Sequence, residues 1–210
     1  MPTDNTQKLK YVSDLVAKCQ KCPLYKNATH PVPGSGSPEA KIVIIGEAPG
    51  FFEDREGLPF VGNSGKLLDK LLAKINIDRH DVFICNILKH RPPENRDPLP
   101  DEIKVCTPYL KAQLEIIKPQ IIVTLGRFAL NYFLPLESIG RIHGQIKNLS
   151  WQGLDITLIP LYHPSAGLRN GTMLRELESD FLKIDSFLHP QPLIVTKDPV
   201  SPTVINPTLF

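Results

Sequence analysis

Three polar side chains in this 210-residue chain stand at or just beyond the ends of apolar runs. They are the carboxylate of Glu47, the amide of Asn86 and the imidazole of His163. A carboxylate can orient water or carry a proton, an amide presents a donor beside an acceptor, and an imidazole can donate or accept. Taken singly, two of them have structural explanations, because Asn86 could cap or bond a neighbouring loop and a lone histidine before proline, as at His163, is usually structural. Grouped at one place, they indicate a binding or catalytic site.

The apolar runs that carry these side chains predict four buried β-strands. They cover residues 41–45, 81–88, 120–125 and 154–161. The alternation of these runs with helical segments predicts an α/β protein, a three-layer α/β/α fold with a central, mainly parallel four-stranded sheet. Parallel strands end at one edge of a sheet, so Glu47, Asn86 and His163 are expected together at that edge.

The stretch 41–72 combines the first strand, a loop rich in glycine and acidic residues, and a helix expected at about 62–72. The first turn of a helix leaves backbone N–H groups unpaired, and the helix dipole is positive there. This unit therefore predicts a site for anions or polar ligands beside Glu47. The loop 89–100 holds four prolines and is expected to be irregular and functional.

Cysteines are the second chemical feature of the chain. Cys19 and Cys22 form a CxxC pair at the end of a helix expected at 11–18, and Cys85 and Cys106 follow far along the chain. Two thiolates at this spacing can share a metal, although a redox pair or incidental thiols would have the same spacing. The chain has no long apolar segment and no signal-peptide pattern, so we expect a cytoplasmic protein without a membrane anchor. A reducing compartment favours metal binding or catalysis over disulfides.

The formal net charge of +2 neither favours nor excludes a nucleic-acid partner. Cationic side chains in the expected loops are candidates for binding an anion, but they are equally typical of an ordinary protein surface. Residues 1–188 are expected to form one domain that includes the cysteine-bearing N-terminal arm. Residues 189–210 are rich in proline and predict an extended or disordered tail.

Three strings in this chain, in their order and spacing, resemble the motifs of family 4 uracil-DNA glycosylases, the iron–sulfur branch of that superfamily. They are GEAPGFFEDREGLPFVGNSGKLL at 46–68, KHRPPENRDPLPDE at 89–102 and HPSAGLRN at 163–170. The likeness extends from Cys19 to about Phe187, and the first string is long enough to be specific. It implies a DNA-repair enzyme that flips uracil out of single- or double-stranded DNA and hydrolyses its N-glycosidic bond, leaving an abasic site.

The resemblance also implies a uracil pocket. Phe60 would stack on the flipped ring, Asn86 would pair with its hydrogen-bonding edge, and His163 would donate to uracil O2, where negative charge develops as the base leaves. Gly46 and Ala48 would line the substrate side of the loop.

The resemblance implies that Glu47 and Asn95 would orient the water molecule that attacks C1′ of the sugar. In family 1 enzymes an aspartate stands where this chain has Ala48, so the usual water-activating carboxylate is missing. Catalysis is therefore expected to depend more on His163 and on charge stabilisation.

Contacts with DNA are implied for the string that begins at His163. Ser165 would contact the DNA, Leu168 would fill the space left by the flipped base, and Arg169 would meet a phosphate. Without the neighbouring motif, Leu168 would be taken for a core residue and Arg169 for ordinary surface.

Family 4 enzymes hold a 4Fe-4S cluster with four cysteines, and Cys19, Cys22 and Cys106 match three of those positions. His90 occupies the position of the remaining cysteine, and histidine can ligate iron in clusters. Cys85 is the competing fourth ligand, but it lies five residues earlier in the chain. We expect His90 to complete the set, because it keeps the register of the surrounding string. The cluster would be structural and would tie the N-terminal arm to the loop 89–100.

The expected function is that of a monofunctional glycosylase without a lyase step, since no lysine in these motifs is an evident Schiff-base nucleophile. The protein is expected to be a monomer. An alternative is a superfamily member that binds and captures uracil or abasic DNA without turnover. A third possibility is a zinc-stapled nucleotide-binding module, which the histidine motif disfavours. The range of lesions beyond uracil is left open.

Overall fold

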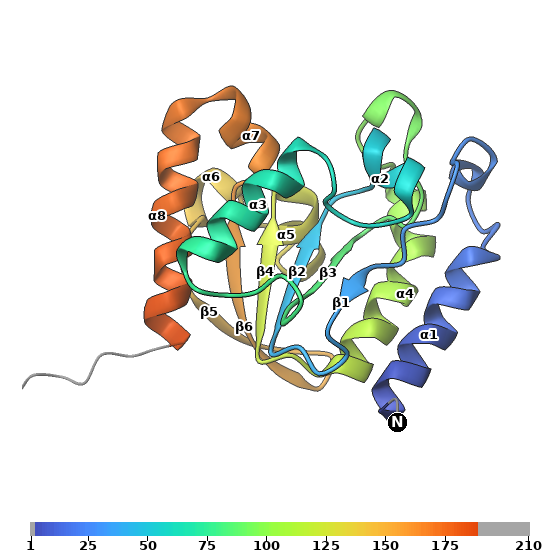
Figure 1. Ribbon diagram of the computed structural model, residues 1–210, viewed down its shortest axis with the longest axis horizontal. Coiled ribbons are helices and arrows are strands. Elements are labelled where there is room, and N and C mark those ends of the chain that lie inside the picture. Colours follow the sequence, from blue (N-terminus) through green and yellow to red (C-terminus); the bar gives the residue numbers. More distant parts are fainter. Residues whose placement is uncertain (1–2, 189–210) are drawn as a thin grey trace, which may run out of the picture.

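The central strand β2 (Ile42–Gly46) is buried along its whole length. Ile42 and Ile44 point into one apolar cluster, and Val43 and Ile45 point into another on the opposite face of the sheet. Successive side chains of a strand alternate between faces, so two apolar faces demand cover on both sides. The result is a sheet between two layers of helices, which confirms the predicted three-layer α/β/α class (Figure 1).

The sheet has six strands in the order β1-β3-β2-β4-β6-β5. The other strands are β1 (Ser35–Gly36), β3 (Phe83–Asn86), β4 (Ile121–Leu125), β5 (Lys147–Trp151) and β6 (Leu154–Leu161). The four predicted strands are β2, β3, β4 and β6, and they are parallel as expected. The expected count of four is corrected to six, because β1 and β5 add antiparallel edges.

Local features explain why β1 was not predicted and how β5 forms. β1 is only two residues long, too short for any periodicity to appear. β5 joins β6 through Gln152 and Gly153, which both have positive φ, 49° and 84°. That pair is typical of the tight hairpin turns whose twist matches the strands beside them.

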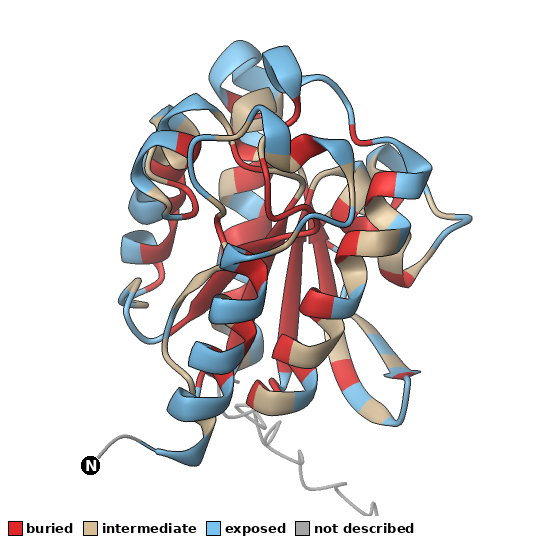
Figure 2. Cartoon of the chain, turned by 90° about the vertical axis from the view of Figure 1, so that its right-hand side faces the viewer, coloured by how far each residue is buried: buried red, intermediate tan, exposed pale blue. Residues whose placement is uncertain are grey.

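Two groups of helices cover the sheet. One face is covered by α1 (Asp4–Ala17), α4 (Pro100–Ile117), α5 (Arg127–Phe133) and α6 (Ile139–Ile142). The other is covered by α3 (Asn63–Lys74) and α8 (Gly171–Leu188). Figure 2 shows the buried strands at the centre and the exposed residues on the outer sides of the helices. Each fully buried aliphatic side chain contributes about 1.5 to 3 kcal/mol, so the two clusters hold the layers together.

Short helices at the upper edge of the sheet depart from the sequence prediction. The loop after β2 contains α2 (Phe51–Glu56), and the segment 163–170, for which no helix was predicted, forms α7 (Pro164–Arg169). Proline at the first helical position suits α7, because its fixed φ is helical and its missing N–H would be unpaired anyway. The loop 89–100 is irregular as expected, apart from the 3₁₀ turn η2 (Pro93–Asn95).

The structure, a computed structural model, describes residues 3–188. The expected tail, 189–210, lies outside the described residues, so the division of the chain into a domain and a tail stays a prediction. None of the described helices is both long enough and apolar enough to cross a membrane.

Candidate active site

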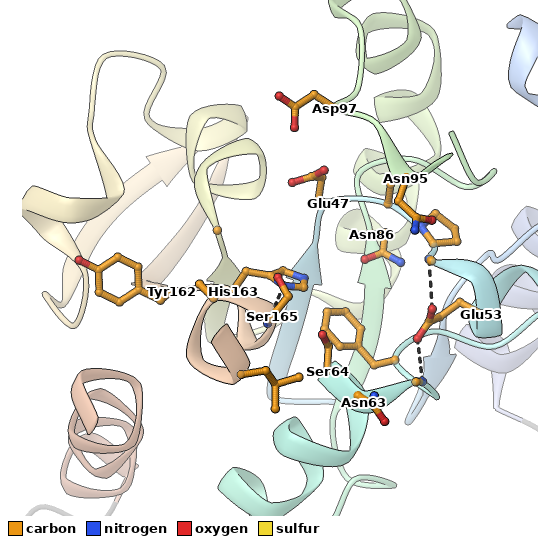
Figure 3. Close-up of a pocket in the computed structure, with 18 of the residues that line it drawn as sticks. Glu47, Glu53, Asn63, Ser64, Asn86, Asn95, Asp97, Tyr162, His163 and Ser165 are labelled. Carbon is orange, nitrogen blue, oxygen red and sulfur yellow. Dashed lines mark hydrogen bonds between the residues drawn. The ribbon is translucent and has the colours of Figure 1, made fainter. Parts of the chain in front are cut away.

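A cavity of about 830 Å³ opens at the edge of the sheet where the four parallel strands end. It is lined by nine of the ten residues for which the resemblance implies a catalytic, substrate-binding or DNA-binding role. They are Glu47, Ala48, Phe60, Asn86, Asn95, His163, Ser165, Leu168 and Arg169. Glu47, Asn86 and His163 come from three different strand ends and surround one space in Figure 3. The expectation that they would meet at one edge is confirmed.

Asn86 is the last residue of β3 and is 2% exposed. Its Oδ1 has no hydrogen-bond partner among the described residues. An unsatisfied buried acceptor costs about 1 to 3 kcal/mol, and proteins retain such groups mainly where function needs them. The amide is therefore poised for a hydrogen-bond donor that enters the cavity.

Phe60 forms one wall beside this amide. Its ring is 5% exposed, and its centroid lies 5.7 Å from that of the His163 ring. Its φ of +52° is the left-handed conformation, which is unusual for an aromatic residue and marks a constrained site. A flat ligand that enters here would lie against the Phe60 ring.

Two glycines make this wall possible. A Cβ at Gly46 would overlap the Asn86 Oδ1 and lie 2.7 Å from the Phe60 Cζ. A Cβ at Gly65 would overlap the Phe60 carbonyl oxygen. Gly46, the tenth expected residue, lies beneath the Phe60 ring and the Asn86 amide without lining the cavity, and it acts by leaving room for them.

His163 is the N-cap of α7, and its ring faces the cavity. The Ser165 backbone N–H donates to His163 Nδ1 at 3.2 Å, and the Ser165 Oγ lies 2.8 Å from the same nitrogen. A backbone N–H can only donate, so Nδ1 is unprotonated and the neutral ring carries its proton on Nε2. Burial, and then the positive charge of Arg169, lower the pKa of His163 to about 4, while Glu53 opposes this shift. The imidazole is neutral at pH 7 and presents an Nε2–H donor.

Glu47 follows β2 directly and lies on the same side of the cavity as Asp97 (Figure 3). Burial raises the pKa of Glu47 to about 7. The negative charge of Asp97 contributes to this rise, and the positive charge of Arg127 opposes it. Asp97 and Arg127 also form an exposed ion pair with each other across the rim. Glu47 can therefore gain or lose a proton near neutral pH.

Asn95 is held in a constrained turn. Glu94 and Asn95 both have left-handed φ values, 54° and 55°, a conformation that costs non-glycine residues of the order of 1 kcal/mol each. Arg91 Nε donates to the Asn95 Oδ1 at 2.8 Å, and Arg96 binds Glu102 through two hydrogen bonds. These contacts hold the turn so that Asn95 lines the cavity.

Leu168 and Arg169 lie on α7 at one side of the opening. Leu168 is 51% exposed, which excludes the alternative that it is a core residue. Arg169 donates to the Ser165 carbonyl oxygen at 3.1 Å, so its guanidinium stays near the rim. Both positions suit contact with a large ligand that approaches from outside.

Sequence reasoning missed Glu53, whose carboxylate accepts three backbone hydrogen bonds. The donors are the N–H groups of Gly50, Val61 and Gly62, at 3.1, 3.0 and 2.9 Å. These bonds join the loop after β2 to the loop that carries Phe60. The spacing of Glu53, three residues after the N-cap Gly50, is that of a capping box and was the available signal.

Cys19, Cys22 and Cys106 lie near one another, and Cys106 contacts Lys89 at the start of the loop 89–100. Burial, and to a smaller extent the nearby Cys22 and Cys19, raise the pKa of Cys106 to about 11, while Lys89 opposes this rise. Burial, and then Cys19, also raise the pKa of Cys22. The Lys89 N–H donates to the Cys106 Sγ at 3.3 Å. Cys106 is buried, and Cys19 and Cys22 are partly buried. A positively charged iron centre beside these thiols would favour their thiolate forms.

The fourth ligand of the expected cluster has two candidates, His90 and Cys85. His90 is buried, and burial lowers the pKa of its imidazole. The negative charge of Asp54 opposes this shift. Cys85 is buried in the apolar cluster on one face of the sheet. Within residues 3–188, no three His, Cys, Asp or Glu side chains are arranged to hold a metal ion. Three thiols lie near one another, but they are not arranged as a metal site, so the cluster and the choice between His90 and Cys85 as its fourth ligand stay predictions.

Comparison with known proteins identifies the family. The model of the uracil DNA glycosylase superfamily matches residues 33–184. A type-4 uracil-DNA glycosylase of Saccharolobus solfataricus is 47% identical over 191 residues, covering 88% of both chains. That of Archaeoglobus fulgidus is 47% identical over 80% of this chain and 87% of its own. That of Thermotoga maritima is 42% identical over 86% of this chain and 94% of its own. The chain therefore belongs to the uracil DNA glycosylase superfamily, in its type-4 group.

Proposed function

We propose that this protein is a monofunctional uracil-DNA glycosylase that takes uracil out of DNA and hydrolyses its N-glycosidic bond. The observation that carries the proposal is the buried Asn86 amide, whose Oδ1 lacks a partner among the described residues and borders a cavity shared with Phe60 and His163. The type-4 uracil-DNA glycosylases to which the chain is similar support the same activity. The product is an abasic site in DNA.

Uracil is selected by its hydrogen-bonding edge. Uracil presents N3–H as a donor beside O4 as an acceptor, and the Asn86 amide offers an acceptor beside a donor. Cytosine presents an unprotonated N3 and an amino group, so it would leave the buried amide unpaired or opposed. Buried polar groups that lose their partners discriminate strongly between substrates. Phe60 stacks on the face of the same ring.

The leaving base is stabilised by His163. As the bond from C1′ to N1 breaks, its electron pair leaves with uracil and spreads to O2. The neutral His163 donates its Nε2–H to that oxygen. A preorganised donor of this kind lowers the barrier by about 2 to 4 kcal/mol, because it needs no reorientation when charge develops.

Water completes the reaction at C1′ of the sugar. Glu47 and Asn95 hold a water molecule, whose oxygen forms the new bond to C1′ while ionised Glu47 accepts its proton. Ala48 offers no second carboxylate in this loop. Since the sugar becomes cation-like as the base departs, a strong general base is not required.

Cys19, Cys22, Cys106 and His90 are proposed to hold a 4Fe-4S cluster. When bound, the cluster would join the N-terminal arm to the loop 89–100 and so stiffen the turn that carries Asn95. Ser165, Leu168 and Arg169 contact the DNA, with Leu168 filling the space that uracil leaves. The protein is proposed to act as a monomer in the cytoplasm, without a membrane, on single- or double-stranded DNA.

A strand-scission assay tests the proposal. The protein is incubated with single-stranded and duplex oligonucleotides that contain one uracil, treated with alkali and run on a denaturing gel. We expect scission at the uracil, reduced about 10²- to 10³-fold in His163→Ala and unchanged in His80→Ala, an exposed histidine outside the cavity. A protein–DNA adduct that survives denaturation would overturn the proposal in favour of capture. A gel with neither scission nor an adduct would overturn it in favour of a nucleotide-binding module.

A further inference from the structure

The outer side of α2 carries two adjacent phenylalanines at the rim of the cavity. Phe51 and Phe52 are each 48% exposed, and their rings meet edge to face with centroids 5.4 Å apart. Phe52 lines the cavity, whereas Phe51 lies outside its lining. Exposed aromatic surface next to a binding site commonly marks contact with a partner. Neither ring has a role in the chemistry described above.

Two arginines accompany the Phe51 ring. The Cζ of Arg91 lies 5.3 Å from its centroid, and the Cζ of Arg55 lies 5.7 Å away. Two neighbouring carboxylates of α2 face inward, since Glu53 binds three backbone N–H groups and Asp54 accepts from the Thr29 N–H. Glu56 is the exposed carboxylate that remains on this helix. We call Phe51, Phe52, Arg55 and Arg91 the aromatic rim.

The aromatic rim lies across the opening from a second exposed group. α7 presents Leu168 and Arg169 at the same edge of the sheet, and Figure 1 shows α2 and α7 on opposite sides of the strand ends. A polynucleotide whose uracil enters the cavity must continue past these walls. Aromatic faces and guanidinium groups are the pairing that binds the bases and phosphates of single strands.

We propose that the aromatic rim binds an unpaired nucleotide next to the flipped uracil, with its base stacked on Phe51 and its phosphate held by Arg55 and Arg91. The proposal rests on the proposed glycosylase function and extends it to the form of DNA that is bound. In a duplex the neighbouring base is paired and stacked within the helix, so its face is withheld from Phe51. The aromatic rim therefore strengthens binding of single-stranded DNA selectively.

The test measures dissociation constants with fluorescent oligonucleotides that contain 2′-fluorinated deoxyuridine, whose electron-poor sugar resists cleavage. Single-stranded and duplex forms are compared for the wild type, Phe51→Ala and Phe51→Leu. Phe187→Ala is the control, because Phe187 is 40% exposed at the far end of α8, away from the cavity. We expect Phe51→Ala to weaken single-strand binding roughly 5- to 150-fold, with a smaller effect on duplex and none in the control. Phe51→Leu should follow Phe51→Ala, because leucine keeps apolar bulk without an aromatic face.

An abasic spacer identifies the contact directly. Replacing the base on the 5′ or the 3′ side of uracil with a spacer should weaken wild-type binding on one side and leave Phe51→Ala binding unchanged on that side. Arg55→Gln and Arg91→Gln should each lower the salt slope of single-strand binding by about 0.7. Equal spacer effects in wild type and Phe51→Ala, or equal losses for single strand and duplex, would overturn the inference. Uracil excision by the wild type is scored separately, so failure of the aromatic rim leaves the proposed function standing.

Discussion

Replacing Glu47 with glutamine tests whether the cavity destabilises the ionised form of this carboxylate. The fold raises the pKa of this group from its ordinary value of 4.5 to about 7, mainly through burial. A tenfold change in an acid dissociation constant corresponds to about 1.4 kcal/mol. Because Glu47 is partly exposed to solvent, we reduce the free-energy cost of its buried charge to about 1 to 2 kcal/mol. Glutamine has nearly the same shape and carries no charge, so it removes the penalty for burying an anion.

The raised pKa of Glu47 sets the direction of the pH dependence. Below pH 4.5 the carboxyl is neutral in both the folded and the unfolded chain, and its contribution to stability is fully present. As the pH rises through about 7, the unfolded chain has already lost the proton while the folded chain resists losing it, so that stability disappears. Above that pH the folded protein holds a buried anion. Glu47→Gln should therefore have about the same unfolding free energy as wild type at about pH 4, and about 1 to 2 kcal/mol more at about pH 8.

Urea unfolding at pH 4, 6 and 8 measures this difference, with Glu56→Gln as the control for an exposed carboxylate on α2. The same preparations give the rate of uracil excision under single-turnover conditions. Wild-type activity should rise with pH through about 7, whereas Glu47→Gln should be at least about 10²-fold slower and flat across that range. A stability difference that is the same at pH 4 and pH 8, or a variant that keeps the wild-type pH profile, would refute the reasoning.

Two further predictions concern the surroundings of the cavity. Asp97→Asn removes a negative charge that raises the pKa of Glu47, so the midpoint of the pH–rate profile should move to lower pH; a midpoint that stays in place or rises would contradict this. His90→Ala should lose iron, labile sulfide and visible absorbance, and Cys85→Ala should retain them; the opposite result would make Cys85 the fourth ligand.

The strand ends could be predicted because their signals are local. Glu47, Asn86 and His163 each follow or close an apolar run, and parallel pairing brings the run ends to one edge regardless of the loops between them. The periodicity of 2 in the strands and of about 3.6 in the helices carries that information along the chain.

Other features depend on contacts between distant segments. Glu53 joins Gly50 to Val61 and Gly62, and Asp97 reaches Arg127, 30 residues further on. The capping-box spacing indicates the Gly50 contact, but nothing in the local pattern specifies Val61, Gly62 or Arg127 as partners. The short helices α2 and α7 escaped prediction for a different reason, since six residues are too few for an apolar period to show.

The most direct test of the proposed function is whether Asn86 makes the protein excise uracil and not cytosine. Single-turnover excision is measured on matched oligonucleotides with uracil or cytosine at one position, for wild type, Asn86→Ala and Asn86→Asp. We predict that wild type removes uracil and leaves cytosine, and that both variants lose at least about 10²-fold on uracil. Asn86→Asp should gain measurable activity on cytosine, because a carboxylate accepts from the cytosine amino group and opposes uracil O4. Uracil excision at the wild-type rate by Asn86→Ala would contradict the claim that this amide reads the base.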